Sequence, residues 1–176
     1  MVWRTVLERQ TSHPGPVGLA LTRQGVPTYD REVFGSAEGA AKGGYVLAEA
    51  EGGEPKVILI GTGSEVQLAV QAREALQAEG VPTRVVSLPS VEWFNEQDQA
   101  YRDSVLPPNV RARVSVEAGI AQGWRELVGD AGRIISLDHF GASADYQVLY
   151  QEFGITADAV ANAARASLRT VEAVSR

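Results

Sequence analysis

The chain has 176 residues, of which 44% are hydrophobic and 22% are charged, and it contains no cysteine. This length is enough to bury a substantial core, and the lack of cysteine excludes disulfides, zinc–thiolate sites and thiol catalysis. The formal net charge of −6 argues against nucleic acid or an anionic membrane as partner, because both attract basic faces. We find no membrane-spanning apolar run and no signal-peptide pattern, so we expect a cytoplasmic protein.

The N-terminal quarter of the chain predicts a helix, a strand and a linker. Residues 2–10 predict a short amphipathic helix, and residues 16–22 predict a strand. The apolar run in that strand does not alternate with polar residues, so we expect both of its faces to be covered, as in a parallel sheet. Residues 24–43 are rich in Gly, Pro, Asp and Ser and predict a linker.

From residue 44 onward, strands and helices alternate. Residues 45–50 and 57–63 predict two strands, and the short EGGEP turn between them favours an antiparallel pair. The other predicted strands cover residues 83–89, 111–118 and 133–140. The predicted helices cover residues 64–79, 93–105, 123–129, 144–153 and 156–174. We therefore predict an α/β fold with three αβα layers and a mostly parallel sheet of about five strands, with one antiparallel strand near an edge.

The turn after the strand at 57–63 is a candidate anion site, because N–H groups at a helix start can bind an anion. The turn comprises Gly61, Thr62, Gly63 and Ser64. Thr62 and Glu65 have the T-x-x-E spacing of a capping box, which makes an ordinary capped turn the simpler interpretation. A dinucleotide fingerprint would need a glycine where Val66 stands, and no P-loop lysine follows.

Polar residues also follow two later strands. Glu117 follows one of them, and Asp138 and His139 follow the other. Ligands of open α/β sheets gather at the carboxyl ends of strands, so these side chains could form an acid/base site. The alternative is structural: Glu117 caps a helix or pairs with Arg111 or Arg113, and His139 packs in the interior or at an interface.

Arg23 stands at the end of the predicted strand at 16–22. A guanidinium in a fixed position matches the oxygens of a phosphate group, and Gln24 adds an amide donor. The alternative is a salt bridge from Arg23 to Asp30 or Glu32. The residues alone leave both interpretations open.

Several segments, taken in chain order, resemble the transketolase family. LALTRQGVP resembles the S-R-Q-N-x-P segment that closes the pyrimidine-binding domain of that family. The segments GGYVLAEA, ILIGTGSEVQLAVQA, VVSLPSVEWFNEQ, YRDSVLP, ARVSVEAG and LDHFGASA resemble its C-terminal domain. The resemblance implies that residues 1–30 end the pyrimidine-binding domain, that 31–43 are a linker, and that 44–176 form the transketolase C-terminal domain.

The resemblance also implies an activity. Transketolases move a two-carbon ketol unit from a ketose phosphate to an aldose phosphate in the pentose phosphate pathway, using thiamine diphosphate and Mg²⁺ or Ca²⁺. The resemblance implies that Arg23, with Gln24 beside it, binds the phosphate of the sugar, and that the protein is a homodimer. Thr22 replaces the usual serine and keeps a hydroxyl, whereas Gly25 replaces an asparagine and loses a side-chain contact.

The cofactor-binding motifs of the family are not evident in this sequence. Their signature is a GDG segment followed by an asparagine, and the nearest segment here, residues 129–132 (GDAG), lies in a different context. We therefore expect a catalytically incomplete C-terminal part that needs N-terminal domains and binds no thiamine diphosphate or metal alone. The alternatives are a free-standing anion-binding regulatory module and the C-terminal subunit of a split transketolase or E1β-like enzyme.

Overall fold

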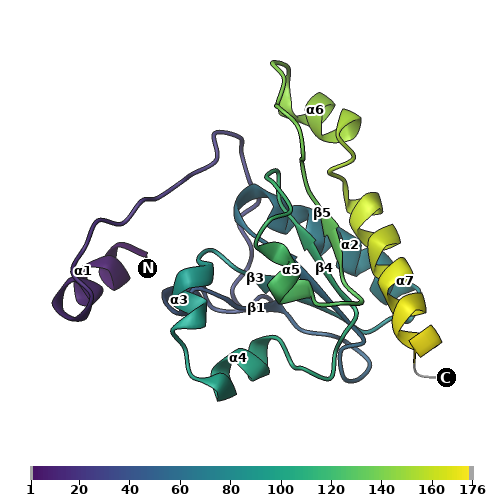
Figure 1. The fold of residues 1–176 in the computed structure, drawn as a ribbon, viewed down its shortest axis with the longest axis horizontal. Helices are drawn as coiled ribbons and strands as arrows, with labels where there is room; N and C mark the ends of the chain where they lie inside the picture. Colours follow the sequence, from purple (N-terminus) through teal and green to yellow (C-terminus); the bar gives the residue numbers. More distant parts are fainter. Residues whose placement is uncertain (1, 175–176) are drawn as a thin grey trace.

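The structure is a computed structural model that describes residues 2–174, and its centre is a five-stranded sheet with the strand order β1-β3-β2-β4-β5 (Figure 1). The strands are β1 (Tyr45–Ala48), β2 (Val57–Gly61), β3 (Thr83–Ser87), β4 (Arg113–Val116) and β5 (Arg133–Ile135). All neighbours pair in parallel except β1, which runs antiparallel to β3 at the edge. The predicted sheet, with one antiparallel strand near an edge, is confirmed.

The partner of the antiparallel strand was predicted wrongly. β1 pairs with β3, with Tyr45 opposite Ser87, and not with β2. β2 instead pairs with β3 on one side and β4 on the other. The sequence of β2, VILIG, is apolar on both faces and fully buried, so it stabilises the fold most in the middle of the sheet.

Helices cover both faces of the sheet, which confirms the three layers. On one face, Val57 and Leu59 of β2 pack in a core with α2 (Val66–Ala78) and α7 (Ala157–Val174). On the other face, Ile58 and Ile60 pack with α3 (Val91–Asn95), α4 (Gln99–Val105) and α5 (Trp124–Val128). The alternation follows from the period of two along a strand. None of the helices in the described part of the chain is long and apolar enough to cross a membrane.

Most predicted helices are present, with shifted ends. The predicted helix at 93–105 is two helices, α3 and α4, because the side chain of Asp98 accepts the Tyr101 N–H and starts a new helix there. α2 ends at Ala78, and two residues later Gly80 has a φ of 76°, the left-handed conformation that glycine favours. The last two predicted helices are α6 (Tyr146–Glu152) and α7, which Thr156 caps through the Ala159 N–H.

The N-terminal helix is confirmed as α1 (Val2–Ser12), and it rests beside α3. The guanidinium of Arg9 lies 4.9 Å from the centre of the Trp93 ring and 2.5 Å from the Glu96 carboxylate. A short 3₁₀ helix, η1 (Ala37–Lys42), then leads into β1.

The predicted strand at 16–22 is wrong. The chain from His13 to Tyr29 runs outside the sheet without strand pairing (Figure 1). Leu21 is 82% exposed and Leu19 is 44% exposed, although their pattern is that of a strand covered on both faces. A strand needs hydrogen-bonding neighbours, and the five strands of residues 2–174 pair only with one another.

Candidate functional site

The carboxyl ends of β2 and β4 lie at the switch point of the sheet, where the connections from two neighbouring parallel strands lead to opposite edges. From β2 the chain crosses through α2 to β3 on one side, and from β4 it crosses through α5 to β5 on the other. Such a switch point is the usual ligand-binding edge of an open α/β sheet. Here it carries the short 3₁₀ helix η2 (Gly63–Glu65) at the start of α2.

Glu65 is the buried charge of this turn, only 6% exposed. Its Oε1 accepts a hydrogen bond of 2.6 Å from the Ser64 hydroxyl and a second one from the hydroxyl of Tyr150. The predicted capping box is therefore wrong, because the Thr62 side chain caps no backbone N–H and the Glu65 carboxylate is held by two hydroxyl groups instead. A carboxylate that is removed from water needs such donors.

Tyr150 connects the turn to the N-terminal segment. It lies on α6, its ring packs against the core beneath α2 and α7, and its hydroxyl donates to Glu65. The same hydroxyl oxygen accepts a hydrogen bond of 3.4 Å from Gln24 Nε2. Burial raises the pKa of the Tyr150 hydroxyl, and the Glu65 carboxylate raises the pKa further, so the hydroxyl keeps its proton at neutral pH.

Arg23 and Gln24, the predicted phosphate-binding residues, differ in how they are held. Gln24 is partly buried, and besides its bond to Tyr150 it accepts a hydrogen bond from the Thr22 hydroxyl. Arg23 is exposed, and none of the ion pairs within residues 2–174 involves it. The alternative salt bridge to Asp30 or Glu32 is therefore not formed among the described residues, and Asp30 Oδ1 accepts the Glu32 N–H at 2.9 Å.

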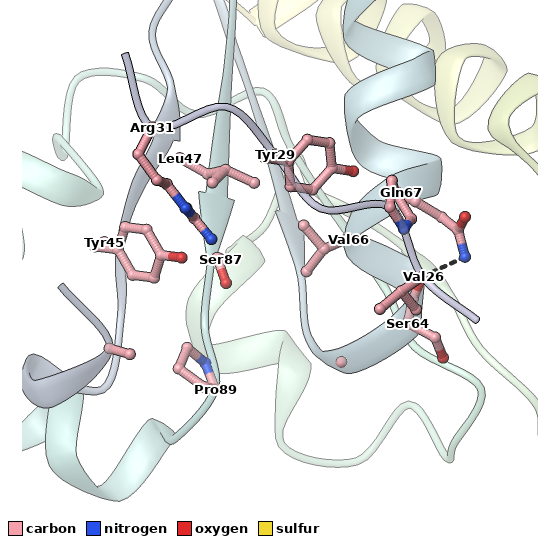
Figure 2. A pocket seen from close by; sticks show the side chains of 13 residues that line it. Val26, Tyr29, Arg31, Tyr45, Leu47, Ser64, Val66, Gln67, Ser87 and Pro89 are labelled. Carbon is pink, nitrogen blue, oxygen red and sulfur yellow. Dashed lines mark hydrogen bonds between the residues drawn. The ribbon is translucent and has the colours of Figure 1, made fainter. Parts of the chain in front are cut away.

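A hollow of about 280 Å³ lies beside the turn, between the linker and the carboxyl ends of β2 and β3 (Figure 2). Its lining includes Val26, Tyr29, Arg31, Tyr45, Leu47, Gly63, Ser64, Val66, Gln67, Ser87 and Pro89. Figure 2 shows the Arg31 guanidinium pointing toward Ser87, and Arg31 also donates to the Gly35 carbonyl at 2.8 Å. Anion binding by the turn that contains Gly61, Thr62, Gly63 and Ser64 stays a prediction.

The strand-end residues Glu117, Asp138 and His139 each have a separate partner. Glu117 Oε2 accepts a hydrogen bond of 2.6 Å from Trp124 Nε1, and not from Arg111 or Arg113. Asp138 Oδ1 accepts the Ala121 N–H at 3.3 Å.

His139 is exposed rather than packed in the interior. Its ring contacts the Phe153 ring edge-on, with centroids 4.8 Å apart, and its Nδ1 lies 2.7 Å from the Phe140 carbonyl oxygen. No hydrogen bond among the described residues joins Glu117, Asp138 and His139 to one another. Their catalytic role stays a prediction.

The residues of the 129–132 segment do not fit a metal–diphosphate clamp. The Asp130 carboxylate pairs with Arg111 at 2.6 Å and accepts the Ala131 N–H at 2.8 Å. The hydrogen bond from Arg111 lowers the pKa of Asp130, and the bond from Ala131 adds to this effect. Nor do residues 2–174 contain a group of three His, Cys, Asp or Glu side chains placed to hold a metal ion.

Sequence reasoning did not find Tyr150. It lies on a short helix, 85 positions after Glu65 in the chain, and no local motif marks it. The available signal was the carboxylate of Glu65 shortly after the buried strand β2, because a buried carboxylate needs hydrogen-bond donors.

Known proteins share this architecture. The family described as "Transketolase-like TK C-terminal domain" matches residues 43–156. The transketolase of Mycobacterium tuberculosis is 56% identical over 170 residues, which is 94% of this chain and 24% of the relative. The chain therefore spans about a quarter of the length of that relative.

Solved structures agree with the sequence relatives. A Pichia stipitis transketolase in complex with sedoheptulose 7-phosphate is 34% identical, with a TM-score of 0.71 over 80% of this chain and 20% of that one. A split-gene transketolase, described as an inactive "beta4 tetramer", shares the fold. Its TM-score is 0.68 at 22% identity, over 94% of this chain and 54% of that one. The five-stranded domain, the family match and these relatives together place the chain in the transketolase family.

Proposed function

We propose that this chain supplies the C-terminal part of a thiamine-diphosphate-dependent transketolase and that Arg23 binds the phosphate group of its sugar substrates. The enzyme transfers a two-carbon ketol unit from a ketose phosphate to an aldose phosphate. The family match over residues 43–156 supports the assignment, as does the solved relative in complex with a sugar phosphate. In this proposal, residues 1–30 complete the pyrimidine-binding domain, 31–43 are the linker and 44–176 are the C-terminal domain.

The observation that carries the proposal is the contrast between Arg23 and its neighbour. The guanidinium of Arg23 is exposed and has no ion pair within the described residues, while Gln24 is tied to Tyr150. An exposed guanidinium without an ion pair, next to a residue that is hydrogen-bonded to the domain, can bind an anionic group. The exposed apolar side chains of Leu19 and Leu21 fit the same proposal, since the rest of a pyrimidine-binding domain would cover them.

Other parts of the enzyme supply the cofactor site in this proposal. Asp130 is engaged by Arg111, so the chain's own residues are assigned no role toward thiamine diphosphate, Mg²⁺ or Ca²⁺. Their roles are to bind the sugar phosphate and to support the domain beside it. We further propose a homodimer in the cytoplasm, as for a soluble enzyme of sugar phosphates.

A chimaera tests the proposal. This chain is joined to the preceding domains of the Mycobacterium tuberculosis transketolase, and two-carbon transfer is measured with phosphorylated and unphosphorylated acceptors. We expect activity from the chimaera and none from the 176-residue chain alone. The Arg23→Ala variant should lose about 10- to 150-fold in kcat/KM for phosphorylated acceptors, because a hydrogen-bonded charge contact contributes about 1.5–3 kcal/mol.

The unphosphorylated acceptor is the control, and its kcat/KM should change little in Arg23→Ala. Transfer by the chain alone, above a contaminant control, would overturn the proposed dependence on other domains. An equal loss with both acceptors would overturn the phosphate-binding role of Arg23. Mixing the two parts as separate polypeptides tests the split-subunit arrangement.

A further inference from the structure

Among the described residues, one hydrogen bond joins the segment that carries Arg23 to the folded domain. Between His13 and Val26 it pairs with no strand, and its apolar residues Val17, Leu19 and Leu21 are exposed. The hydrogen bond from Gln24 to Tyr150 joins it to α6. After it, Val26, Pro27 and Tyr29 lie against the domain around the hollow. Of the hydrogen bonds to the domain within residues 2–174, the one from Gln24 therefore lies nearest to Arg23 in the chain.

The support behind this contact is buried and polar. The Tyr150 hydroxyl donates to the Glu65 carboxylate, and that carboxylate also accepts from the Ser64 hydroxyl. Because the hydroxyl has one proton and gives it to Glu65, its oxygen is left to accept from the Gln24 amide. The Glu65 carboxylate thus sets the orientation of the Tyr150 hydroxyl, and the hydroxyl oxygen in turn holds the side-chain amide of Gln24.

The Gln24 side chain is held at both ends. Its Nε2 donates to Tyr150, and its Oε1 accepts from the Thr22 hydroxyl. Thr22 and Gln24 flank Arg23, so the hydrogen bond between their side chains links the residues on either side of Arg23. A chain of hydrogen bonds therefore runs from the start of α2 to both neighbours of Arg23.

We propose that Tyr150 is a positioning residue that, supported by Glu65, holds the Thr22–Gln24 segment in the conformation that presents Arg23 to a phosphate group. The inference rests on the proposed function for its catalytic consequence, but its structural part stands alone. It gives the C-terminal domain a defined task in substrate binding. Tyr150 acts on substrate through Gln24 and Arg23 and makes no substrate contact itself.

Trypsin cleavage after Arg23 tests the structural part on the 176-residue chain. The variant is Tyr150→Phe, which removes the hydroxyl and keeps the ring that packs on the core. We expect the cut between Arg23 and Gln24 to become about tenfold faster, because cleavage follows local opening and one hydrogen-bond connection to the domain is lost. The cut after Arg31 provides the internal reference, and its rate should stay unchanged.

The matched control is Tyr101→Phe. Tyr101 is also half-buried, and its hydroxyl donates to the Gly44 carbonyl at 2.8 Å, far along the chain from Arg23. It should leave both cleavage rates as they are in the parent chain. An unchanged rate after Arg23 in Tyr150→Phe, or an equal rise after Arg23 and Arg31, would overturn the proposal.

The chimaeric enzyme tests the catalytic consequence. Tyr150→Phe should raise KM for phosphorylated acceptors about tenfold and leave kcat/KM for unphosphorylated acceptors unchanged. Added to Arg23→Ala, it should cause little further loss, since both changes act through one guanidinium. Additive losses would overturn the positioning role.

The two proposals fail in different ways. If Arg23→Ala shows no preference between acceptors while Tyr150→Phe still speeds cleavage after Arg23, the proposed function fails and the structural link stands. If Arg23→Ala is selective for phosphorylated acceptors but Tyr150→Phe changes neither cleavage nor KM, the proposed function stands and the positioning role fails.

Discussion

Arg84 on β3 binds Glu49 just beyond β1 through two parallel hydrogen bonds, of 2.9 Å from Nε and 2.7 Å from Nη2. The remaining nitrogen, Nη1, donates to the carbonyls of Ser104 and Val105 at the end of α4. The Arg84 side chain is only 11% exposed, whereas that of Glu49 is 56% exposed. One guanidinium thus joins the antiparallel edge strand to its neighbour and to a helix end.

Glu49→Gln should destabilise the chain by about 1–2 kcal/mol, because it removes the charge that compensates a largely buried guanidinium. The value lies below that of a fully buried pair because solvent screens the exposed carboxylate. Urea unfolding of both proteins measures the difference. The control is Glu8→Gln, where the side chain is 66% exposed and pairs with an Arg4 side chain that is 63% exposed, and it should cost less than about 0.5 kcal/mol. Equal costs would contradict this account.

The Glu49 pair also predicts a pH dependence. Partial burial by itself raises the pKa of Glu49, but hydrogen bonds from Arg84 and the Ala50 N–H outweigh it, and the pKa is lowered from its ordinary value of 4.5. The stability that Glu49 contributes is therefore full above about pH 4.5 and is lost as the pH falls through the lower folded-state pKa.

The measurement is the free energy of unfolding of the parent chain and of Glu49→Gln between pH 3 and pH 7, a range of about four pH units chosen to span the carboxylate titration. Other carboxylates titrate equally in both proteins, so the difference between the curves isolates Glu49. We expect that difference to shrink on the acid side. A constant difference would show that Glu49 does not act through its charge.

The sheet could be predicted because its evidence is local. Each strand is an apolar run bounded by turn residues, and the alternation with helices determines the parallel direction. The partner of β1 was predicted wrongly because strand order depends on which run is most apolar, and VILIG takes the centre. The short EGGEP turn shows that β1 and β2 are close in sequence, but it does not determine that they pair with each other.

The contacts of the candidate site were harder to predict because they join distant positions. Arg23 and Gln24 were predicted from their pattern, but the Gln24–Tyr150 bond spans 126 positions and no spacing rule reveals it. The segment at 16–22 has the pattern of a buried strand, yet pairing requires neighbours that residues 2–174 do not offer. The sequence of a segment indicates its preferred secondary structure, but a strand forms only where neighbouring strands are available to pair with it.

Ser115 of β4 gives a third prediction. Its side chain is fully buried, and its hydroxyl is the one buried side-chain polar atom of the described residues that has no hydrogen-bond partner. Ser115→Ala removes this unsatisfied group, so we expect a change between zero and about 1 kcal/mol of added stability. Thermal or urea unfolding provides the measurement.

Ser167 is the matched control for Ser115. It is equally buried on α7, and its hydroxyl donates to the Ala131 carbonyl at 2.7 Å. Ser167→Ala should cost about 1 kcal/mol, the usual contribution of a satisfied hydrogen bond. If both substitutions destabilise equally, the Ser115 hydroxyl has a partner, and the prediction is wrong.

Arg113 on β4 gives the last prediction. Its guanidinium donates to four carbonyls, of which those of Leu106 and Pro107 follow α4 and that of Leu127 lies in α5. The last carbonyls of a helix have no partner within the helix, and this one side chain serves two helix ends. Burial lowers the pKa of Arg113, with a nearby carboxylate opposing the shift, yet it remains a cation.

Arg113→Lys should therefore destabilise the chain by about 2–3 kcal/mol, although the charge is kept, because a single ammonium cannot serve four carbonyls at once. The control is Arg111→Lys on the same segment, where the side chain is 37% exposed and pairs with an Asp130 side chain that is 75% exposed. That change should stay within about 0.5 kcal/mol. Urea unfolding at neutral pH compares the two. Similar small costs for both would mean that charge alone, and not the planar fork of donors, stabilises these helix ends.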